Sequence, residues 1–268
     1  MTSRFRTLRV SDPRFEVEHL RFVTLKSPAL GRRADVTLYV PPGIAAGAAP
    51  LPLLILLHGV HGSHWHWAFR GGAHRTAGRM IESGALRPML LAMPSDGLWG
   101  DGSGYLAHGG ADYENYIIEE VPSAVAEVTG LRAPDAGFFL AGLSMGGFGA
   151  LRLGAQHPGR VKGISVHSAV TELSQLGQFI EEPLEAYEVP SKEDGSALHW
   201  LAKKKGSLPP LRFDCGTKDS LIGANRELHR GLLDQGIPHT YQEHDGEHNF
   251  EYWEKRLPDT LLFVNGLL

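Results

Sequence analysis

Short, wholly apolar runs constrain this chain more than any other feature of its sequence. Leu53–Leu57 is a run of apolar residues in which apolar and polar positions do not alternate. A strand that packs against helices on both faces has this composition, and such strands belong to parallel sheets. Similar runs occur at residues 89–93, 138–141, 161–166 and 211–215. The sequence therefore predicts a mostly parallel sheet between two layers of helices.

Segments with helical periodicity lie between these runs. We predict helices at residues 73–83, 115–129, 147–156, 221–235 and 251–268. Strands that alternate with helices favour an α/β fold with an open sheet, right-handed crossovers and helices on both faces.

The first part of the chain has a different pattern. Residues 15–26 and 34–40 alternate apolar and polar side chains, which is typical of strands. Near the other end of the chain, a last strand is predicted at 237–243. We expect the two leading strands to be antiparallel and to form one edge of the sheet. Residues 43–50, which are rich in Ala, Gly and Pro, are expected to form a loop.

Length and pattern favour a single domain over residues 1–268. Single α/β domains often reach this length. Residues 171–208 fit neither period, are polar and are interrupted by Pro and Gly. We predict that they form a cap-like insertion over the carboxyl edge of the sheet and the active site.

Charge and cysteine content exclude several classes of protein. The 30 acidic and 26 basic residues give a net charge of −4, so the chain has no electrostatic signature of nucleic-acid binding. The one cysteine, Cys215, cannot form an intrachain disulfide. Residues 1–10 lack the apolar core of a signal peptide, and no transmembrane helix is predicted. We expect a cytoplasmic protein that binds neither nucleic acid nor membrane, with homo-oligomers left open.

The most informative motif is Gly-Leu-Ser-Met-Gly-Gly at residues 142–147. It contains G-x-S-x-G directly after a buried run and directly before a predicted helix, which is the context of a nucleophile elbow. Glycine at 142 and 146 leaves room for a very tight turn. The turn exposes the hydroxyl of Ser144 at a helix N-terminus, where backbone N–H groups stabilise negative charge.

A nucleophilic serine needs a base, and the base needs an orienting carboxylate. In this kind of fold the acid and then the histidine follow the serine along the chain. Asp219 lies just beyond a predicted strand and His248 lies in the loop before the last helix, so we predict these two as acid and base. The alternatives are Asp214 and Asp245 for the acid and His244 for the base.

Acyl transfer also requires donors for the developing oxyanion. One predicted donor is the backbone N–H of Met145, which follows the serine. The other is the N–H of Val60, in the glycine-containing loop at residues 58–62 that follows the first buried run. The alternative is that the glycines of this loop serve only to turn the chain.

Four histidines lie between residues 58 and 66. Metal binding is the obvious hypothesis for such a cluster. The cluster contains no carboxylate or cysteine, and alternation with tryptophan directs the imidazoles to different sides. We therefore predict no metal site, and expect these histidines to be hydrogen-bonded in the wall of a cleft.

Aromatic residues near the predicted site are candidates for substrate binding. We predict this role for His61, Trp65 and Trp99, and Trp67 and Tyr105 are further candidates for the lining of an acyl or alcohol pocket. The alternative for each aromatic residue is a place in the core.

Four segments together resemble one known family. They are residues 58–62, 142–150, 215–219 and 248–253. They are similar to the corresponding segments of the Putative esterase family of α/β-hydrolases, over roughly residues 18–265. This family includes tributyrin esterases, S-formylglutathione hydrolases, feruloyl and acetyl-xylan esterases and mycolyltransferases, and the similarity is greatest to the tributyrin esterases.

The resemblance implies an α/β-hydrolase fold, a catalytic triad of Ser144, Asp219 and His248, and oxyanion donors at Val60 and Met145. Many members carry leucine or methionine where this chain has Val60, a difference that a backbone donor tolerates. The segments 94–112 and 171–208 match the family only loosely, so the resemblance implies no particular substrate.

We therefore predict a serine carboxylesterase that hydrolyses a small ester, with a short-chain or aromatic acyl group, through an acyl-enzyme. Its partner would be the small-molecule ester, and it would use neither a metal nor another cofactor. The alternatives are an acyltransferase with a sugar or lipid acceptor and an S-formylglutathione-type thioesterase. Further alternatives are a catalytically silent binding protein and a metal-dependent hydrolase that uses the histidines at 58–66.

Overall fold

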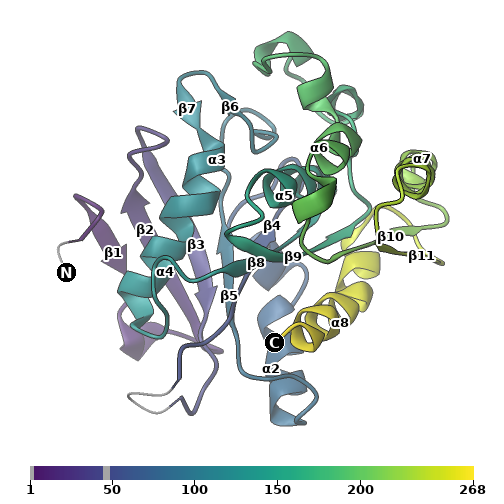
Figure 1. Ribbon diagram of the computed structural model, residues 1–268. Coiled ribbons are helices and arrows are strands. Elements are labelled where there is room, and N and C mark those ends of the chain that lie inside the picture. Colours follow the sequence, from purple (N-terminus) through teal and green to yellow (C-terminus); the bar gives the residue numbers. More distant parts are fainter. Residues whose placement is uncertain (1–2, 45–48) are drawn as a thin grey trace.

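The strands form one large sheet in the computed structural model, which describes residues 3–44 and 49–268. The predicted loop at 43–50 and the N-terminal segment fall partly outside the described residues. Within the described part, the sheet has nine strands in the order β1-β2-β3-β5-β4-β8-β9-β10-β11 (Figure 1). The strands are β1 (Leu8–Val10), β2 (Leu20–Lys26), β3 (Arg33–Tyr39), β4 (Leu53–Leu57), β5 (Leu90–Pro94), β8 (Phe138–Leu143), β9 (Val161–His167), β10 (Leu211–Gly216) and β11 (Thr240–His244).

The direction of the strands divides the sheet into two parts. β1, β2 and β3 pair antiparallel with one another, and β3 pairs antiparallel with β5. From β5 to β11 every neighbouring pair is parallel. This confirms the predicted α/β fold with a mostly parallel sheet and an antiparallel edge. A small second sheet joins β6 (Ala107–His108) to β7 (Ala111–Asp112).

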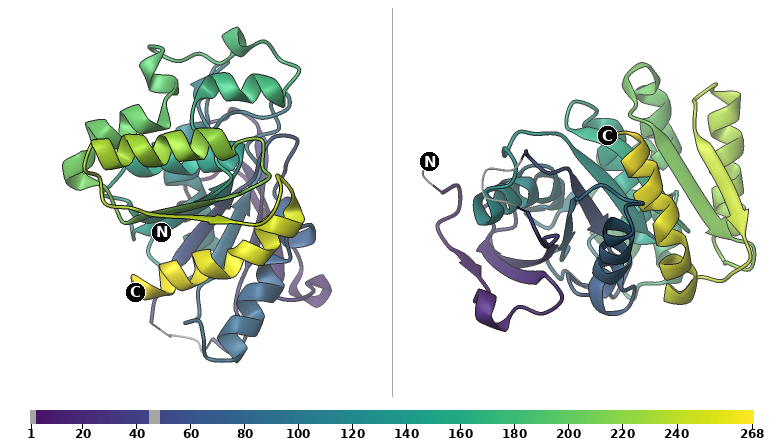
Figure 2. Two further views of the ribbon diagram at one scale, coloured as in Figure 1. Left: turned by 90° about the vertical axis from the view of Figure 1, so that its right-hand side faces the viewer. Right: turned by 90° about the horizontal axis from the view of Figure 1, so that it is seen from below.

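Helices cover both faces of the large sheet. They are α1 (His66–Phe69), α2 (Ala73–Glu82), α3 (Tyr113–Asn115), α4 (Val121–Thr129), α5 (Met145–Gln156), α6 (Ala197–Lys203), α7 (Ile222–Asp234) and α8 (Phe250–Gly266). The left view in Figure 2 shows α7 and α8 on opposite sides of the sheet. In the described residues, no helix is both long enough and apolar enough to cross a membrane.

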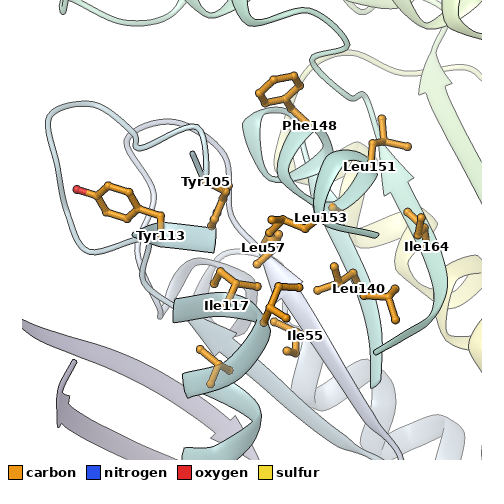
Figure 3. Packing of buried hydrophobic residues seen from close by; sticks show 14 of the residues in the cluster. Ile55, Leu57, Tyr105, Tyr113, Ile117, Leu140, Phe148, Leu151, Leu153 and Ile164 are labelled. Atoms are coloured by element: carbon orange, nitrogen blue, oxygen red, sulfur yellow. The ribbon is translucent and has the colours of Figure 1, made fainter. Parts of the chain in front are cut away.

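The apolar run of β4 explains this layering. Leu53, Ile55 and Leu57 belong to one hydrophobic core, together with residues of α4, α5 and α7. Leu54 and Leu56 belong to a second core on the other face, against α2 and α8. Successive side chains of a strand point to opposite faces, so an all-apolar strand is stable only when both faces are covered. Figure 3 shows the packing of the first core around Ile55 and Leu57.

The structure corrects the predicted start of the first long strand. Residues 13–15 form a 3₁₀-helix and β2 begins only at Leu20, so the strand prediction is wrong for residues 15–19. Glu18 and His19 have φ values of 52° and 62°. Left-handed backbone does not continue a strand. The sequence analysis also missed the short edge strand β1.

The helix predicted at 115–129 is also interrupted. Residues 116–120 form a turn of π-helix, in which the amide of Val121 donates to the carbonyl of Tyr116, and α4 begins at Val121. Pro122 follows directly and has no N–H to continue the α-helical ladder, which accounts for the local change.

Residues 171–208 form a series of short helices between β9 and β10. The 3₁₀-helices are Leu173–Gln178, Leu184–Ala186, Glu193–Gly195 and Lys205–Ser207, and the sequence analysis missed helix α6. Ser196 caps α6 by accepting a hydrogen bond from the amide of His199. Such a capped short helix is too brief to show a clear period in the sequence.

A buried polar network joins β9 and β10 to α8. The carboxylate of Asp214 accepts hydrogen bonds from Arg212, from Nδ1 of His167 at 2.9 Å and from the hydroxyl of Tyr252 at 2.8 Å. On its other side, His167 hydrogen-bonds Thr260 of α8 through Nε2. Burial opposes the ionisation of Asp214, but His167 and Arg212 outweigh it and lower the pKa from 3.8 to about 2.

We predict that Asp214 stabilises the fold in a pH-dependent way. Because its pKa is lower in the folded state, its contribution is complete above about pH 4 and is lost as the pH falls towards 2. Asp214→Asn should lower the free energy of unfolding at pH 7 by about 3–5 kcal/mol, since it leaves the buried guanidinium of Arg212 without its counter-charge. Urea denaturation at pH 7 and pH 3 measures both effects.

The matched control is Asp245→Asn, because Asp245 is exposed and pairs with Lys218 at the surface. This variant should unfold as the wild type does. An Asp214→Asn protein with wild-type stability at pH 7 would contradict the assigned role of the network.

Candidate active site

Ser144 lies on the sharp turn between β8 and α5. Its φ and ψ are 53° and −121°, a conformation that non-glycine residues rarely adopt. The turn is held by backbone hydrogen bonds: the amide of Ser144 donates to the carbonyl of His167, and its carbonyl accepts from the amide of Val170, both at 3.1 Å. The neighbouring strand β9 and the residues after it therefore fix the serine at the carboxyl edge of the sheet.

Two glycines make this turn possible. A Cβ atom on Gly142 would lie 2.2 Å from the carbonyl oxygen of Gly146. A Cβ atom on Gly146 would lie 2.3 Å from the carbonyl oxygen of Leu57, at the end of β4. Both contacts are with backbone atoms that cannot rotate away. The G-x-S-x-G spacing thus lets the start of α5 pack directly against β4 and β8.

The structure brings His248 and Asp219 together with Ser144. Nε2 of His248 is 3.0 Å from Oγ of Ser144, and Nδ1 is 2.9 Å from Oδ2 of Asp219. A carboxylate can only accept, so Nδ1 carries the proton and Nε2 is left to accept from the serine hydroxyl. Asp219 follows β10, and His248 precedes α8, whose first turn is capped by the side chain of Asn249.

Asp219 is 2% exposed. Burial opposes its ionisation, but hydrogen bonds from His248 and from the amide of Leu221, together with the charge of His248, outweigh it and lower its pKa below 3.8. Asp219 is therefore ionised at neutral pH and suited to hold the imidazole and stabilise its cation.

The alternative acids and base lie elsewhere. Asp214 is fully buried in the network with His167 and Arg212. Asp245 pairs with Lys218 at the surface. His244 ends β11, beside Gly216 of β10, and has no hydrogen bond to Ser144 among the described residues.

The two predicted oxyanion donors have free amides. Within residues 3–44 and 49–268, neither the N–H of Val60 nor that of Met145 donates to a protein acceptor. Met145 is the first residue of α5, so its amide also lies at the positive end of the helix dipole. The loop with Val60 is held by buried His58, which donates from Nδ1 to the carbonyl of Gly59 and accepts at Nε2 from the amide of Asp96.

A cavity of about 320 Å³ opens beside Ser144 and His248. Its aromatic lining comes from Phe250 and Trp253 of α8 and from Phe179, which belongs to the segment 171–208. The ring of Phe179 stacks on His248 with 5.4 Å between the ring centroids. The sequence analysis missed these three residues: Phe250 and Trp253 follow the histidine closely in sequence, whereas no motif marks Phe179.

The predicted substrate-binding residues divide into two groups. His61 lines the cavity, and its Nε2 is 3.4 Å from a carboxylate oxygen of Asp101. Trp65 stacks on His66 outside the lining, and Trp99 packs against His108 and Tyr187 away from the cavity.

Two further aromatic candidates belong to the interior. Trp67 is buried and donates from its indole N–H to the carbonyl of Leu57. Tyr105 is buried and donates its hydroxyl to the carbonyl of His58. Both side chains therefore support the walls of the site and do not face it.

The histidines at 58–66 have separate partners. Besides His58 and His61, Nδ1 of His64 hydrogen-bonds Thr37, and Nδ1 of His66 accepts from the amide of Ser63. In the described part of the chain, no three His, Cys, Asp or Glu side chains are grouped as metal ligands would be.

We predict that Gly142→Ala destabilises the protein. The new methyl group would meet backbone atoms of Gly146, and relieving the clash requires α5 to move away from the sheet. The expected loss in the free energy of unfolding is about 1–3 kcal/mol or more, measured by urea denaturation. The control is Gly159→Ala, where a Cβ has nothing within 4 Å. Equal stability of the two variants would refute the packing argument.

Comparisons with known proteins relate this chain to esterases. A family model described as "Putative esterase" matches residues 27–264. An acetyl esterase of Caldicellulosiruptor saccharolyticus is 29% identical over 235 residues, which are 80% of this chain and 84% of that protein.

Solved structures resemble the fold over nearly its whole length. A ferulic acid esterase has a TM-score of 0.79 at 24% identity, over 98% of this chain and 99% of the other. The fluorophosphonate-binding serine hydrolase F of Staphylococcus aureus has a TM-score of 0.77 at 23% identity, over 91% and 96%. At these identities the structures establish the α/β-hydrolase fold. The match to the family model covers most of the chain and also establishes the family: the protein belongs to the esterase family described as "Putative esterase".

Proposed function

We propose that this protein is a serine carboxylesterase that works through an acyl-enzyme. The observation that carries the proposal is the continuous hydrogen-bonded chain from Ser144 through His248 to the buried carboxylate of Asp219. Nucleophile, base and orienting acid lie at the distances that such catalysis requires.

In the acylation step, Oγ of Ser144 attacks the ester carbonyl while Nε2 of His248 takes the hydroxyl proton. Asp219 holds the imidazole by Nδ1 and stabilises the cation that forms. The carbonyl oxygen becomes an oxyanion and accepts hydrogen bonds from the amides of Val60 and Met145. When the tetrahedral intermediate collapses, the bond to the alkoxy group breaks and His248 returns its proton to the departing alcohol.

Deacylation repeats the same steps with water. His248 takes a proton from water as the oxygen attacks the acyl carbonyl, and the same two amides hold the oxyanion. The bond to Oγ then breaks, and the proton on His248 returns to Ser144 as the carboxylic acid leaves. Every step uses groups of this chain, the ester and water.

The size and lining of the cavity favour a small ester. A volume of about 320 Å³ is at the lower end of ligand sites. Phe179, Phe250 and Trp253 offer aromatic surface for a short-chain or aromatic acyl group. The names of two similar proteins, an acetyl esterase and a ferulic acid esterase, support the same two classes of substrate.

Replacing Ser144 by alanine should abolish ester hydrolysis. We expect kcat for p-nitrophenyl acetate to fall by roughly 10⁴–10⁶-fold, because the members of a triad act as a unit. Thermal unfolding should show that the variant is folded. In the wild type, a fluorophosphonate probe should label the peptide that contains Ser144. Labelling of another peptide, or hydrolysis by Ser144→Ala at the wild-type rate, would refute the mechanism.

A further inference from the structure

The ionisable side chains that line the catalytic cavity are all basic. Among the described residues, the ionisable side chains that line it are His61, His66, Arg70 and His248, and none is Asp or Glu. This asymmetry is not needed for the triad chemistry, which proceeds with an uncharged ester.

Arg70 is the permanent charge on this wall. It follows α1, and its guanidinium carbon lies 4.8 Å from the centre of the Phe250 ring, which also lines the cavity. This cation–π contact holds the side chain against the cavity. Within residues 3–44 and 49–268, no carboxylate lies within 4.0 Å of Arg70. The charge and the planar set of N–H donors are therefore available to a ligand.

His66 supplies a second donor. Its Nδ1 accepts a hydrogen bond of 2.8 Å from the amide of Ser63, so the proton of the neutral ring is on Nε2. Burial, with added repulsion from His58 and Arg70, lowers the pKa of His66 to about 4, so the ring is neutral at pH 7. Stacking on Trp65 at 4.0 Å fixes its orientation. Within the described residues, Nε2–H has no acceptor.

Asp101, an acid next to this wall, is engaged elsewhere. Asp101 lies 3.4 Å from Nε2 of His61, and its other carboxylate oxygen accepts from the amide of Glu181. Asp101 therefore faces His61 and, among the described residues, makes no ion pair with Arg70.

We propose that the ester substrate carries a carboxylate, which Arg70 binds with the help of the Nε2–H of His66. Arginine pairs with carboxylates through two parallel hydrogen bonds, and a cation without an ion-pair partner on a cavity wall also attracts anions from solution. The inference rests on the proposed function, because it concerns the ester attacked by Ser144. It adds the class of substrate: a monoester that retains a free acid group.

Two pairs of esters test the proposal. In the first, the charge is on the acyl side: monoethyl glutarate is compared with ethyl glutaramate, its neutral amide. In the second, it is on the alcohol side: 4-acetoxybenzoate is compared with 4-acetoxybenzamide. Chromatography of the products gives kcat/KM for each ester, and the measured quantity is the ratio of the acid to the amide within a pair.

We expect Arg70→Gln to lower this ratio about tenfold in at least one pair, mainly through KM of the acid, since a charge-assisted hydrogen bond is lost. Comparing the ratio between proteins cancels differences in intrinsic reactivity and any general loss of activity. The control Arg79→Gln makes the same change in net charge on α2, outside the cavity, and should keep the wild-type ratio. Arg70→Lys keeps the charge without the planar fork and should give an intermediate ratio.

The outcomes separate this inference from the proposed function. If Arg70→Gln and the wild type have the same ratio in both pairs, the carboxylate site is refuted. If Arg79→Gln lowers the ratio as much as Arg70→Gln does, general electrostatics explains the effect and the site is refuted as well. Ser144→Ala should hydrolyse none of the four esters. If it hydrolyses them at the wild-type rate, the proposed function itself is wrong.

Discussion

The close approach of α5 to the ends of β4 and β8 is the constraint on which the site depends. Gly142 and Gly146 allow backbone to pack on backbone, with no room for a Cβ on either residue. The same approach forces Ser144 into its left-handed conformation and leaves the amide of Met145 free at the start of a helix. Strained backbone of this kind persists only when its surroundings hold it, and here the hydrogen bonds to His167 and Val170 do so.

The second requirement is that α8 holds in place the loop before it, which brings His248 to the serine. Asp214 and Tyr252 tie the first turn of α8 to β10, and Thr260 ties its later part to β9 through His167. The buried network thus holds α8 in position, and none of its members belongs to the proposed triad. Its polar groups satisfy one another, which makes the position of the helix specific in a way that apolar contacts alone would not.

The cavity combines parts of the chain that are distant in sequence. Its aromatic surface comes from α8 and from Phe179 in the segment 171–208, and hydrogen-bond donors come from His66 of α1 and from Arg70, which follows α1. The cavity beside the reacting atoms therefore offers both apolar surface and hydrogen-bond donors. Such an arrangement can orient an ester by both ends, which is how binding at a distance from the reacting bond assists catalysis.

Features that depend on local pattern can be predicted from the sequence alone. The apolar run of β4 requires cover on both faces, and the glycines at 142 and 146 require a tight turn, because in each case neighbouring residues in the chain set the constraint. The position of Asp219 just beyond a strand predicts it as the acid ahead of Asp214, but the contact between Asp219 and His248 depends on the tertiary structure. Packing between distant segments likewise decided that Phe179 and Arg70 line the cavity and that Trp99 does not, since no local pattern encodes which side chains meet across a fold.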